Sequence, residues 1–284
     1  MKTASGITNE KMLKDELIAV LNSQKIAYNS VKVFRDDNLY AVLGIKWDDE
    51  NNFSLAYIEF VNDLKPEEVK SLLKHEICHF LSIRTTKIRT IRVAEEYVKY
   101  AMIFREFLAH KEFRKRFGID EGLASFHRGN LKHYDVLVKQ ARLIRQISRV
   151  EDYQRLLYFF LSILYDAIYF YVMKDDWFRR WCQRRNLSAL HRVYEWIYED
   201  MAYFSGLTLG QEQKEKLVQK AAIFPISLNL VSILQNNRID VIEELFKQGT
   251  DFDEMLNSEP EMQHIAEKWI QRLTMLSSIN DSPY

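Results

Sequence analysis

Two histidines and a glutamate in one short stretch of this sequence could bind a metal ion and use it in catalysis. The stretch is His75-Glu76-Ile77-Cys78-His79, which has the pattern H-E-x-x-H. On a helix, residues at i and i+4 share a face, so both imidazoles can reach the same ion. Two imidazoles and one carboxylate are a typical catalytic zinc set, with a fourth position left for water. The motif therefore predicts that His75 and His79 bind zinc and that Glu76 takes a proton from the water.

The residues around the motif predict the helix that it needs. Pro66 suits the first helical position, and Glu67 and Glu68 would lie near the positive end of the helix dipole. We expect this helix over residues 66–83 and a second long helix over residues 91–117, which ends at Gly118.

A third protein ligand must come from outside the motif. The extended pattern with a third histidine needs Gly at position 82 and His at position 85, where this chain has Ser82 and Thr85. The better candidate is Glu106, in the middle of the second helix. Ala109, one turn on, is small enough to let two helices approach closely.

This layout resembles the gluzincins, a family of zinc peptidases, and among them the small minigluzincins. Their core is a small sheet, an H-E-x-x-H helix and a second helix with E-x-x-A-D, which corresponds to residues 28–117 here. The resemblance implies that His75, His79 and Glu106 bind Zn2+ and that Glu76 is the general base. His110 stands where the family has an Asp that orients a ligand histidine.

Other residues remain as alternatives for the third ligand: Glu95, Glu96 and His110. Three histidines further along the chain, His127, His133 and His191, could donate a hydrogen bond to an oxyanion. The preferred interpretation is that each is an ordinary core or surface residue.

Three segments rich in Val, Ile, Tyr and Phe predict strands, at residues 31–34, 39–47 and 53–62. We expect them to form a small antiparallel sheet. In zincins, the strand before the motif helix borders the upper side of the cleft. The resemblance therefore implies that an extended peptide could pair with the strand at residues 53–62.

The whole chain is predicted to be α+β, with a zincin-like metallopeptidase domain over residues 1–126 and an all-helical domain over residues 127–284. A loop is expected from Gly122 to Asn130. Helical periodicity marks the segments 8–26, 131–148, 152–173, 175–184, 187–204, 211–222, 226–236, 238–247 and 259–277.

Composition excludes several classes of protein. The 284 residues include 40 basic and 40 acidic side chains, which argues against nucleic-acid binding through the field of the whole protein. Only 2 cysteines, Cys78 and Cys182, give no disulfide framework. With no apolar stretch near Met1 that would mark a secretory signal, we expect a cytoplasmic protein.

Leu156–Met173 is the one segment apolar enough to raise the question of a membrane. Asp166 lies inside it and would cost roughly 2.5–3.5 kcal/mol at a bilayer centre. A buried core helix is therefore preferred to a membrane span.

Together these features predict a zinc-dependent metallopeptidase that acts on a peptide or protein substrate. The alternative is a non-catalytic helical interaction or regulatory protein with a structural or vestigial metal site. The requirement for Glu76 distinguishes the two functions, because a peptidase needs a general base and a structural zinc site does not. The sequence does not predict an oligomeric state.

Overall fold

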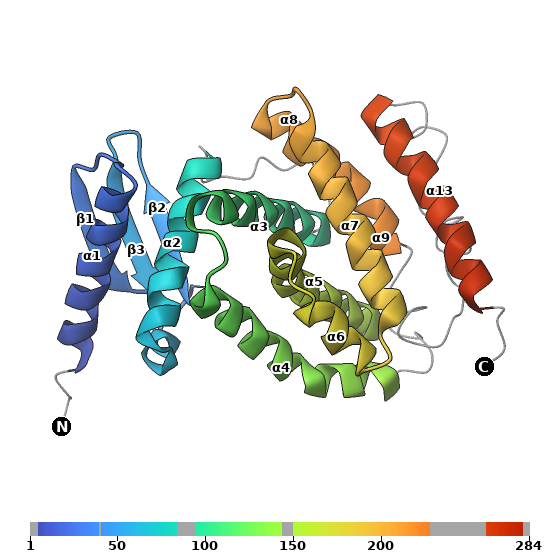
Figure 1. Cartoon of the computed structure of the whole chain (residues 1–284), viewed down its shortest axis with the longest axis horizontal. Coiled ribbons are helices and arrows are strands. Elements are labelled where there is room, and N and C mark those ends of the chain that lie inside the picture. The colour runs from blue at the N-terminus through green and yellow to red at the C-terminus, as the bar shows by residue number, and fades with distance from the viewer. Residues whose placement is uncertain (1–4, 40, 84–94, 144–149, 228–259, 281–284) are drawn as a thin grey trace. The chain divides into compact units, whose positions relative to one another are not determined.

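The computed structural model describes residues 5–39, 41–83, 95–143, 150–227 and 260–280 (Figure 1). The fold is α+β, as predicted, and mostly helical. The chain divides into two compact units, the first made of Met1–Lys87 and Leu108–Arg128 and the second of Ile88–Phe107 and Gly129–Tyr284. The proposed division at residue 126 into a metallopeptidase domain and a helical domain stays a prediction.

Unit 1 contains a sheet of three strands, β1 (Ser30–Arg35), β2 (Leu43–Trp47) and β3 (Asn52–Tyr57). Their spatial order is β1-β3-β2. β2 pairs antiparallel with β3, but β1 pairs parallel with it, so the sheet is mixed and the prediction of an antiparallel sheet was wrong.

The burial of β3 explains this order. Phe53 and Leu55 are both 0% exposed, and Ala56 and Tyr57 are also buried. A strand this apolar is stabilised in the middle of the sheet, where it has neighbours on both sides. The chain continues from β3 into a short 3-10 helix, η1 (Glu59–Asp63), where the sequence had predicted more strand.

Two helices cover one face of the sheet, α1 (Ser5–Ser23) and α2 (Pro66–Ser82). α1 packs against β1, α2 packs against β2, and the two helices pack against each other (Figure 1). Leu13, Leu17 and Leu21 recur every four residues along α1 and are each 0% exposed, so the predicted amphipathic helix is confirmed.

Two long helices run from one unit into the other, α3 (Glu95–Phe117) and α4 (Glu121–Leu143). The left-handed backbone at Gly118, with φ 72°, ends α3 as predicted. The loop predicted from Gly122 to Asn130 was wrong, because α4 begins at Glu121 and includes both glycines of that stretch.

The rest of unit 2 is helical. Its helices are α5 (Val150–Met173), α6 (Trp177–Gln183), α7 (Ser188–Gly206), α8 (Gln211–Ala221), α9 (Ile223–Ser227) and α13 (Pro260–Asn280). α7 packs against α5, α6 and α8, and α13 packs against α8. The helix predicted at residues 238–247 lies outside the described residues.

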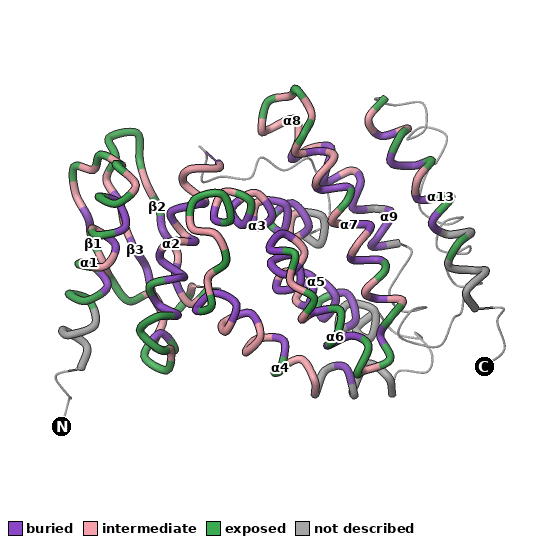
Figure 2. The backbone as a smooth tube through the Cα atoms, in the orientation of Figure 1, coloured by how far each residue is buried: buried purple, intermediate pink, exposed green. Residues whose placement is uncertain are grey.

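α5 contains the apolar segment Leu156–Met173, which is long and apolar enough to cross a membrane. In this structure 78% of that segment is buried, and Figure 2 shows burial along much of α5. Asp166 is 1% exposed and accepts a hydrogen bond from the Asn130 side chain at 3.0 Å. These contacts favour the predicted core helix over a membrane span.

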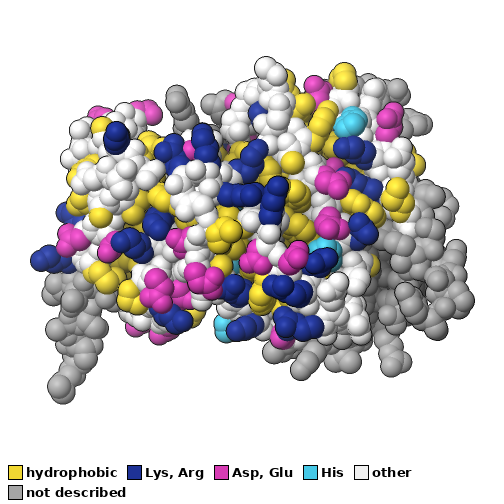
Figure 3. Space-filling model, viewed as in Figure 1, with side chains coloured by type: hydrophobic (Ala, Val, Ile, Leu, Met, Phe, Trp, Pro, Cys, Tyr) yellow, Lys and Arg dark blue, Asp and Glu magenta, His cyan; other side chains and the backbone are white. Residues whose placement is uncertain are grey.

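Charged side chains of both signs cover the face drawn in Figure 3, where Lys and Arg lie among Asp and Glu. This mixture agrees with the net charge of zero.

Candidate metal centre

The H-E-x-x-H motif lies on α2, and the start of this helix is fixed by local contacts. Pro66 is the first helical residue, as predicted, and the Glu68 carboxylate accepts a hydrogen bond from the backbone N–H of Lys65 at 3.0 Å. Ser125 on α4 donates a second hydrogen bond to Glu68, at 2.7 Å. The end of α2 that precedes the motif is therefore held in place.

α2 also packs unusually closely against α4, because Gly122 has no side chain. A Cβ atom at Gly122 would lie 2.4 Å from the Ser71 hydroxyl and 2.6 Å from the Glu67 carbonyl oxygen. The neighbouring Asp120 accepts hydrogen bonds from Ser71 and from Lys74, the latter at 3.0 Å. Ser71 and Lys74 thus link α2 to the start of α4 just before His75.

Asp120 is kept charged by these contacts. Burial by itself would raise the pKa of Asp120, but hydrogen bonds from Ser71, from the backbone N–H of Leu123 and from Lys74 outweigh it, so the pKa is lowered from 3.8. The carboxylate therefore remains an acceptor for both α2 side chains.

The other side of α2 is anchored on the sheet by an aromatic contact. The Phe80 ring, next to His79 in sequence, meets the Trp47 ring edge-on at 5.3 Å and the Phe53 ring at 5.2 Å. The sheet and α4 together fix the rotation of α2, and this rotation determines where the motif side chains point.

The two histidines of the motif point their outer nitrogens at each other. His75 Nε2 and His79 Nε2 lie 3.2 Å apart. Two nitrogens bound to one tetrahedral zinc at the usual bond length would lie about 3.3 Å apart. The spacing of the predicted pair is therefore compatible with a shared zinc ion, and it is also that of a hydrogen bond between the two rings.

Glu76 lies beside this pair. The ligand atoms of His75, Glu76 and His79 are all within 4.8 Å of one another. Glu76 and His79 are half-buried, whereas His75 is 4% exposed. Solvent can thus reach the side of the site where Glu76 lies.

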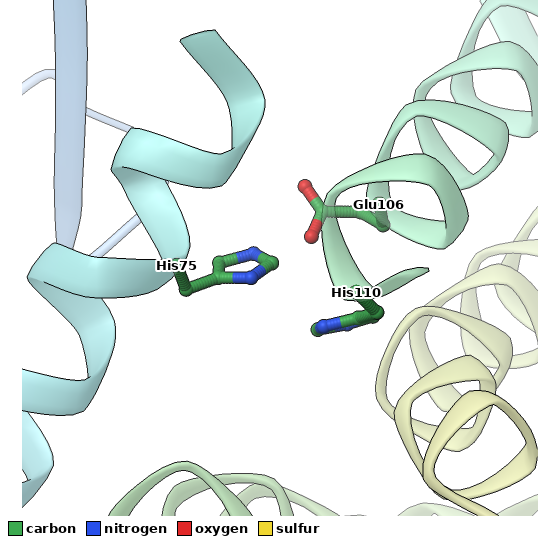
Figure 4. A group of neighbouring side chains, drawn as sticks. All are labelled: His75, Glu106 and His110. Carbon is green, nitrogen blue, oxygen red and sulfur yellow. The ribbon is translucent and has the colours of Figure 1, made fainter. Parts of the chain in front are cut away.

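A second group around His75 comes from α3. The ligand atoms of His75, Glu106 and His110 are likewise within 4.8 Å of one another, and all three residues are buried. Figure 4 shows Glu106 and His110 on successive turns of α3, with both side chains directed toward His75. The structure thus places Glu106, the favoured third ligand, near His75, whereas Glu76 and His79 form a separate group with His75.

A contact within unit 2 holds the part of α3 that carries Glu106. The adjacent Arg105 makes a two-pronged ion pair with Glu215 of α8, at 2.8 and 2.9 Å. The two side chains of this pair are 11% and 3% exposed, so it is strongly constrained.

Beyond the predicted ligands, the site contains a column of buried imidazoles. The His110 ring stacks on the His75 ring with 4.5 Å between centroids, and the His127 ring of α4 meets His110 edge-on at 5.3 Å. His110 is 0% exposed and His127 is 2% exposed. From the sequence, His127 had been interpreted as an ordinary histidine in preference to an oxyanion-stabilising donor.

A sequence signal for His127 did exist. Leu123, His127 and Leu131 recur every four residues, and all three are buried in α4. The signal was missed because Leu123 and His127 lie in the stretch that had been predicted to be a loop.

The remaining candidates lie elsewhere or are not described. The side chains of Glu95 and Glu96 are outside the described residues. Glu96 precedes Glu106 by ten positions on α3, about 15 Å along a helix. Cys78 is 0% exposed, and burial raises the pKa of its thiol to about 12. It is a packed thiol, as predicted, and it is not among the grouped ligand atoms that the described residues bring together.

The strand expected to pair with a peptide needs correction. β3 lies between β1 and β2, so both of its sides are already hydrogen-bonded. β2 is the outer strand that α2 contacts, and it runs antiparallel to β3. Of the described strands, β2 is therefore the one next to the motif helix with an open side.

Two groups of possible metal ligands meet at His75, one with Glu76 and His79 on the same helix and the other with Glu106 and His110 of α3. These donor types fit zinc, and the half-buried Glu76 could handle the proton of an attacking water. Comparisons with protein-family models, with curated proteins and with solved structures find no match to this chain.

Proposed function

We propose that this protein is a zinc-dependent hydrolase that cleaves peptide bonds. The observation that carries the proposal is the 3.2 Å separation of His75 Nε2 and His79 Nε2, with Glu76 next to them on the same helix. In this account His75, His79 and Glu106 bind the ion. When bound, zinc supplies a Lewis acid that polarises the substrate carbonyl and acidifies water.

Glu76 provides the proton transfers. Its carboxylate lies on the half-buried side of the site, where water can reach it. It takes a proton from the attacking water as the new C–O bond forms. It then delivers that proton to the leaving amine as the C–N bond breaks, so the carboxylate is restored.

The substrate in this proposal is an extended polypeptide segment. If such a segment adds a strand to the sheet, it pairs with β2 (Leu43–Trp47) and not with β3, because β3 has partners on both sides. This assignment replaces the strand at residues 53–62.

The experiment compares Glu76→Gln with wild type at matched zinc content. Each protein is incubated with a pool of denatured proteins, and new peptide termini are counted by mass spectrometry. We expect the variant to keep its zinc and to lose about 10²–10⁴-fold in cleavage rate, the usual contribution of general acid–base catalysis.

The control is Glu67→Gln, which removes the same charge from an exposed position on the same helix. It should cleave at the wild-type rate. Equal rates in wild type and Glu76→Gln, or no cleavage by zinc-loaded wild type, would contradict the proposal.

A structural metal site is the second candidate function. The observation that favours it is the burial of His75, Glu106 and His110 together, which is typical of closed sites. Under this alternative, zinc removal would unfold unit 1, and Glu76→Gln would change nothing measurable.

A further inference from the structure

We propose that His110 is a fourth protein ligand to the metal and that it holds the site in a closed resting form. This inference rests on the proposed zinc site and adds to it a means of regulation. It concerns the one position, residue 110, where the chain departs from the E-x-x-A-D pattern.

The position of His110 places it within reach of the ion. It follows Glu106 by one helical turn, so the two side chains share a face of α3 (Figure 4). The ligand atoms of His75, Glu106 and His110 lie within 4.8 Å of one another. His79 belongs to a second group with His75 and Glu76, so a four-ligand site requires side-chain rotations that bring both groups onto one ion, with ligand atoms about 3.3 Å apart.

The orientation of the His110 ring does not suit the role of the Asp in the E-x-x-A-D pattern, which is to orient a ligand histidine. An orienting carboxylate accepts a hydrogen bond in the plane of the ligand imidazole. The His110 and His75 rings instead stack, with an interplanar angle of 28°. In this arrangement neither ring directs a nitrogen at the edge of the other, so His110 does not reproduce the orienting bond.

The surroundings of His110 keep its ring at the site. His75 lies on one side of it and His127 meets it edge-on at 5.3 Å. His110 is 0% exposed, so the ring cannot turn into solvent without a movement of the helices around it. A nitrogen that is held beside two ligands and shielded from water is well placed to bind the ion itself.

A fourth protein ligand has a functional consequence. Four-coordinate zinc with four protein ligands is typical of closed sites, whereas catalytic sites leave one position for water. His110 must then leave the ion, or the coordination number must rise, before water can bind beside Glu76. The resting protein would have low activity, and loss of His110 would raise it.

The test counts the imidazoles bound to zinc by X-ray absorption at the zinc edge, on the full-length protein. We expect about three in wild type and about two in His110→Asn. His133→Asn, which changes an exposed histidine of α4, is the control and should retain about three.

A second measurement tests whether the site is closed. In cobalt-substituted protein, acetohydroxamate should change the visible spectrum of His110→Asn at concentrations at least about tenfold lower than in wild type, because the variant has an open position. If His110→Asn fails to fold, the wild-type imidazole count still decides the question.

The outcomes separate the two proposals. A wild-type zinc with only about two imidazoles would overturn the role of His110 and leave the hydrolase proposal intact. A wild-type protein that binds no zinc would overturn both.

Discussion

Cys78 lies between the two histidines of the motif, yet its surroundings keep it out of the chemistry. Thiolates, and not thiols, bind zinc and attack electrophiles. Burial raises the pKa of Cys78 to about 12, and it also raises the pKa of Cys182, so both remain protonated near neutral pH. The two candidate groups of the described residues accordingly contain only imidazoles and carboxylates.

A thiol titration tests whether Cys78 and Cys182 are buried in the folded protein. In the native protein at pH 8, Ellman's reagent should detect no thiol within minutes, because both cysteines are buried. After denaturation it should detect 2, the number in the sequence. Rapid reaction of one native thiol would mean that Cys78 or Cys182 is accessible and that the thiol could bind metal.

The motif residues were predictable because a helix places i and i+4 on one face. This rule predicted that His75 and His79 would meet, and they do, at 3.2 Å. The proximity of Glu106 was predicted from its place on a second helix. The stacking of His110 between His75 and His127 was not predictable, because it depends on how three helices pack.

At the scale of elements, the contact between α2 and α4 fixes the direction of the motif helix. Gly122 makes the contact possible, because any side chain there would clash with Glu67 and Ser71. Gly129 lies two turns further along α4 and has open space around it. The two glycines therefore have opposite expected effects.

Alanine substitutions test this contrast. Gly122→Ala should lower the free energy of unfolding by about 1–3 kcal/mol through overpacking and should weaken zinc binding. Gly129→Ala should raise the free energy of unfolding by about 0.5–1 kcal/mol, since alanine favours a helix. Urea unfolding of both variants gives the values, and a stable Gly122→Ala protein would show that α2 and α4 do not pack this closely.

The same contact should give unit 1 a characteristic response to acid. The pKa of Asp120 is lowered from 3.8 in the folded state, so the unfolded state binds the proton more tightly. The stabilising contribution is complete above pH 3.8 and is lost as the pH falls below that value.

Asp120→Asn removes this titrating group and should make unfolding less sensitive to pH below 3.8. Unfolding curves collected at several acid pH values measure the slope. An identical slope in wild type and variant would mean that the folded protein does not perturb Asp120.

Element types were largely predictable from the sequence, whereas their pairing was not. Segments rich in Val, Ile, Tyr and Phe predicted three strands, but such a composition is the same in an antiparallel and in a mixed sheet. The position of β3 in the middle depends on which strand buries most surface, which is a property of the assembled unit. The start of α4 was missed because Gly122 and Asn130 are common in loops.

At the scale of the whole molecule, unit 2 is held together by a buried ionic cluster. Asp200 of α7 accepts hydrogen bonds from Trp269 and Arg272 of α13, each at 2.8 Å. The Asp200 and Arg272 side chains are 4% and 6% exposed. Burial outweighs these partners and raises the pKa of Asp200 to about 6.

Two variants compare how much the buried partner of Arg272, Asp200, and its exposed partner, Glu199, each contribute to stability. Asp200→Ala leaves a buried guanidinium without this partner and should lower the free energy of unfolding by about 3–5 kcal/mol. Glu199→Gln alters a side chain that is 57% exposed, so this variant should change the free energy of unfolding by less than about 1 kcal/mol. Thermal unfolding compares them, and equal effects would mean that the cluster does not hold α13 to α7.

The organisation of the chain into units was the least predictable feature. Sequence composition suggested a change near residues 118–130, and one boundary between the units lies there, after Arg128. The sequence did not suggest that Ile88–Phe107 belongs to unit 2, so that α3 and α4 each pass from one unit to the other. Long helices carry no local signal for such a passage, because their periodicity continues through it. The proximity of the motif side chains could therefore be predicted from local spacing, whereas the passage of helices between units could not.

The central claim is that His75 and His79 bind one zinc ion together with Glu106. Elemental analysis of wild type, His79→Ala and Glu106→Ala, after zinc reconstitution and removal of excess metal, tests it most directly. The account predicts about one zinc per wild-type chain and at least about tenfold weaker binding in both variants. Wild-type protein without zinc, or full zinc retention in His79→Ala, would contradict it.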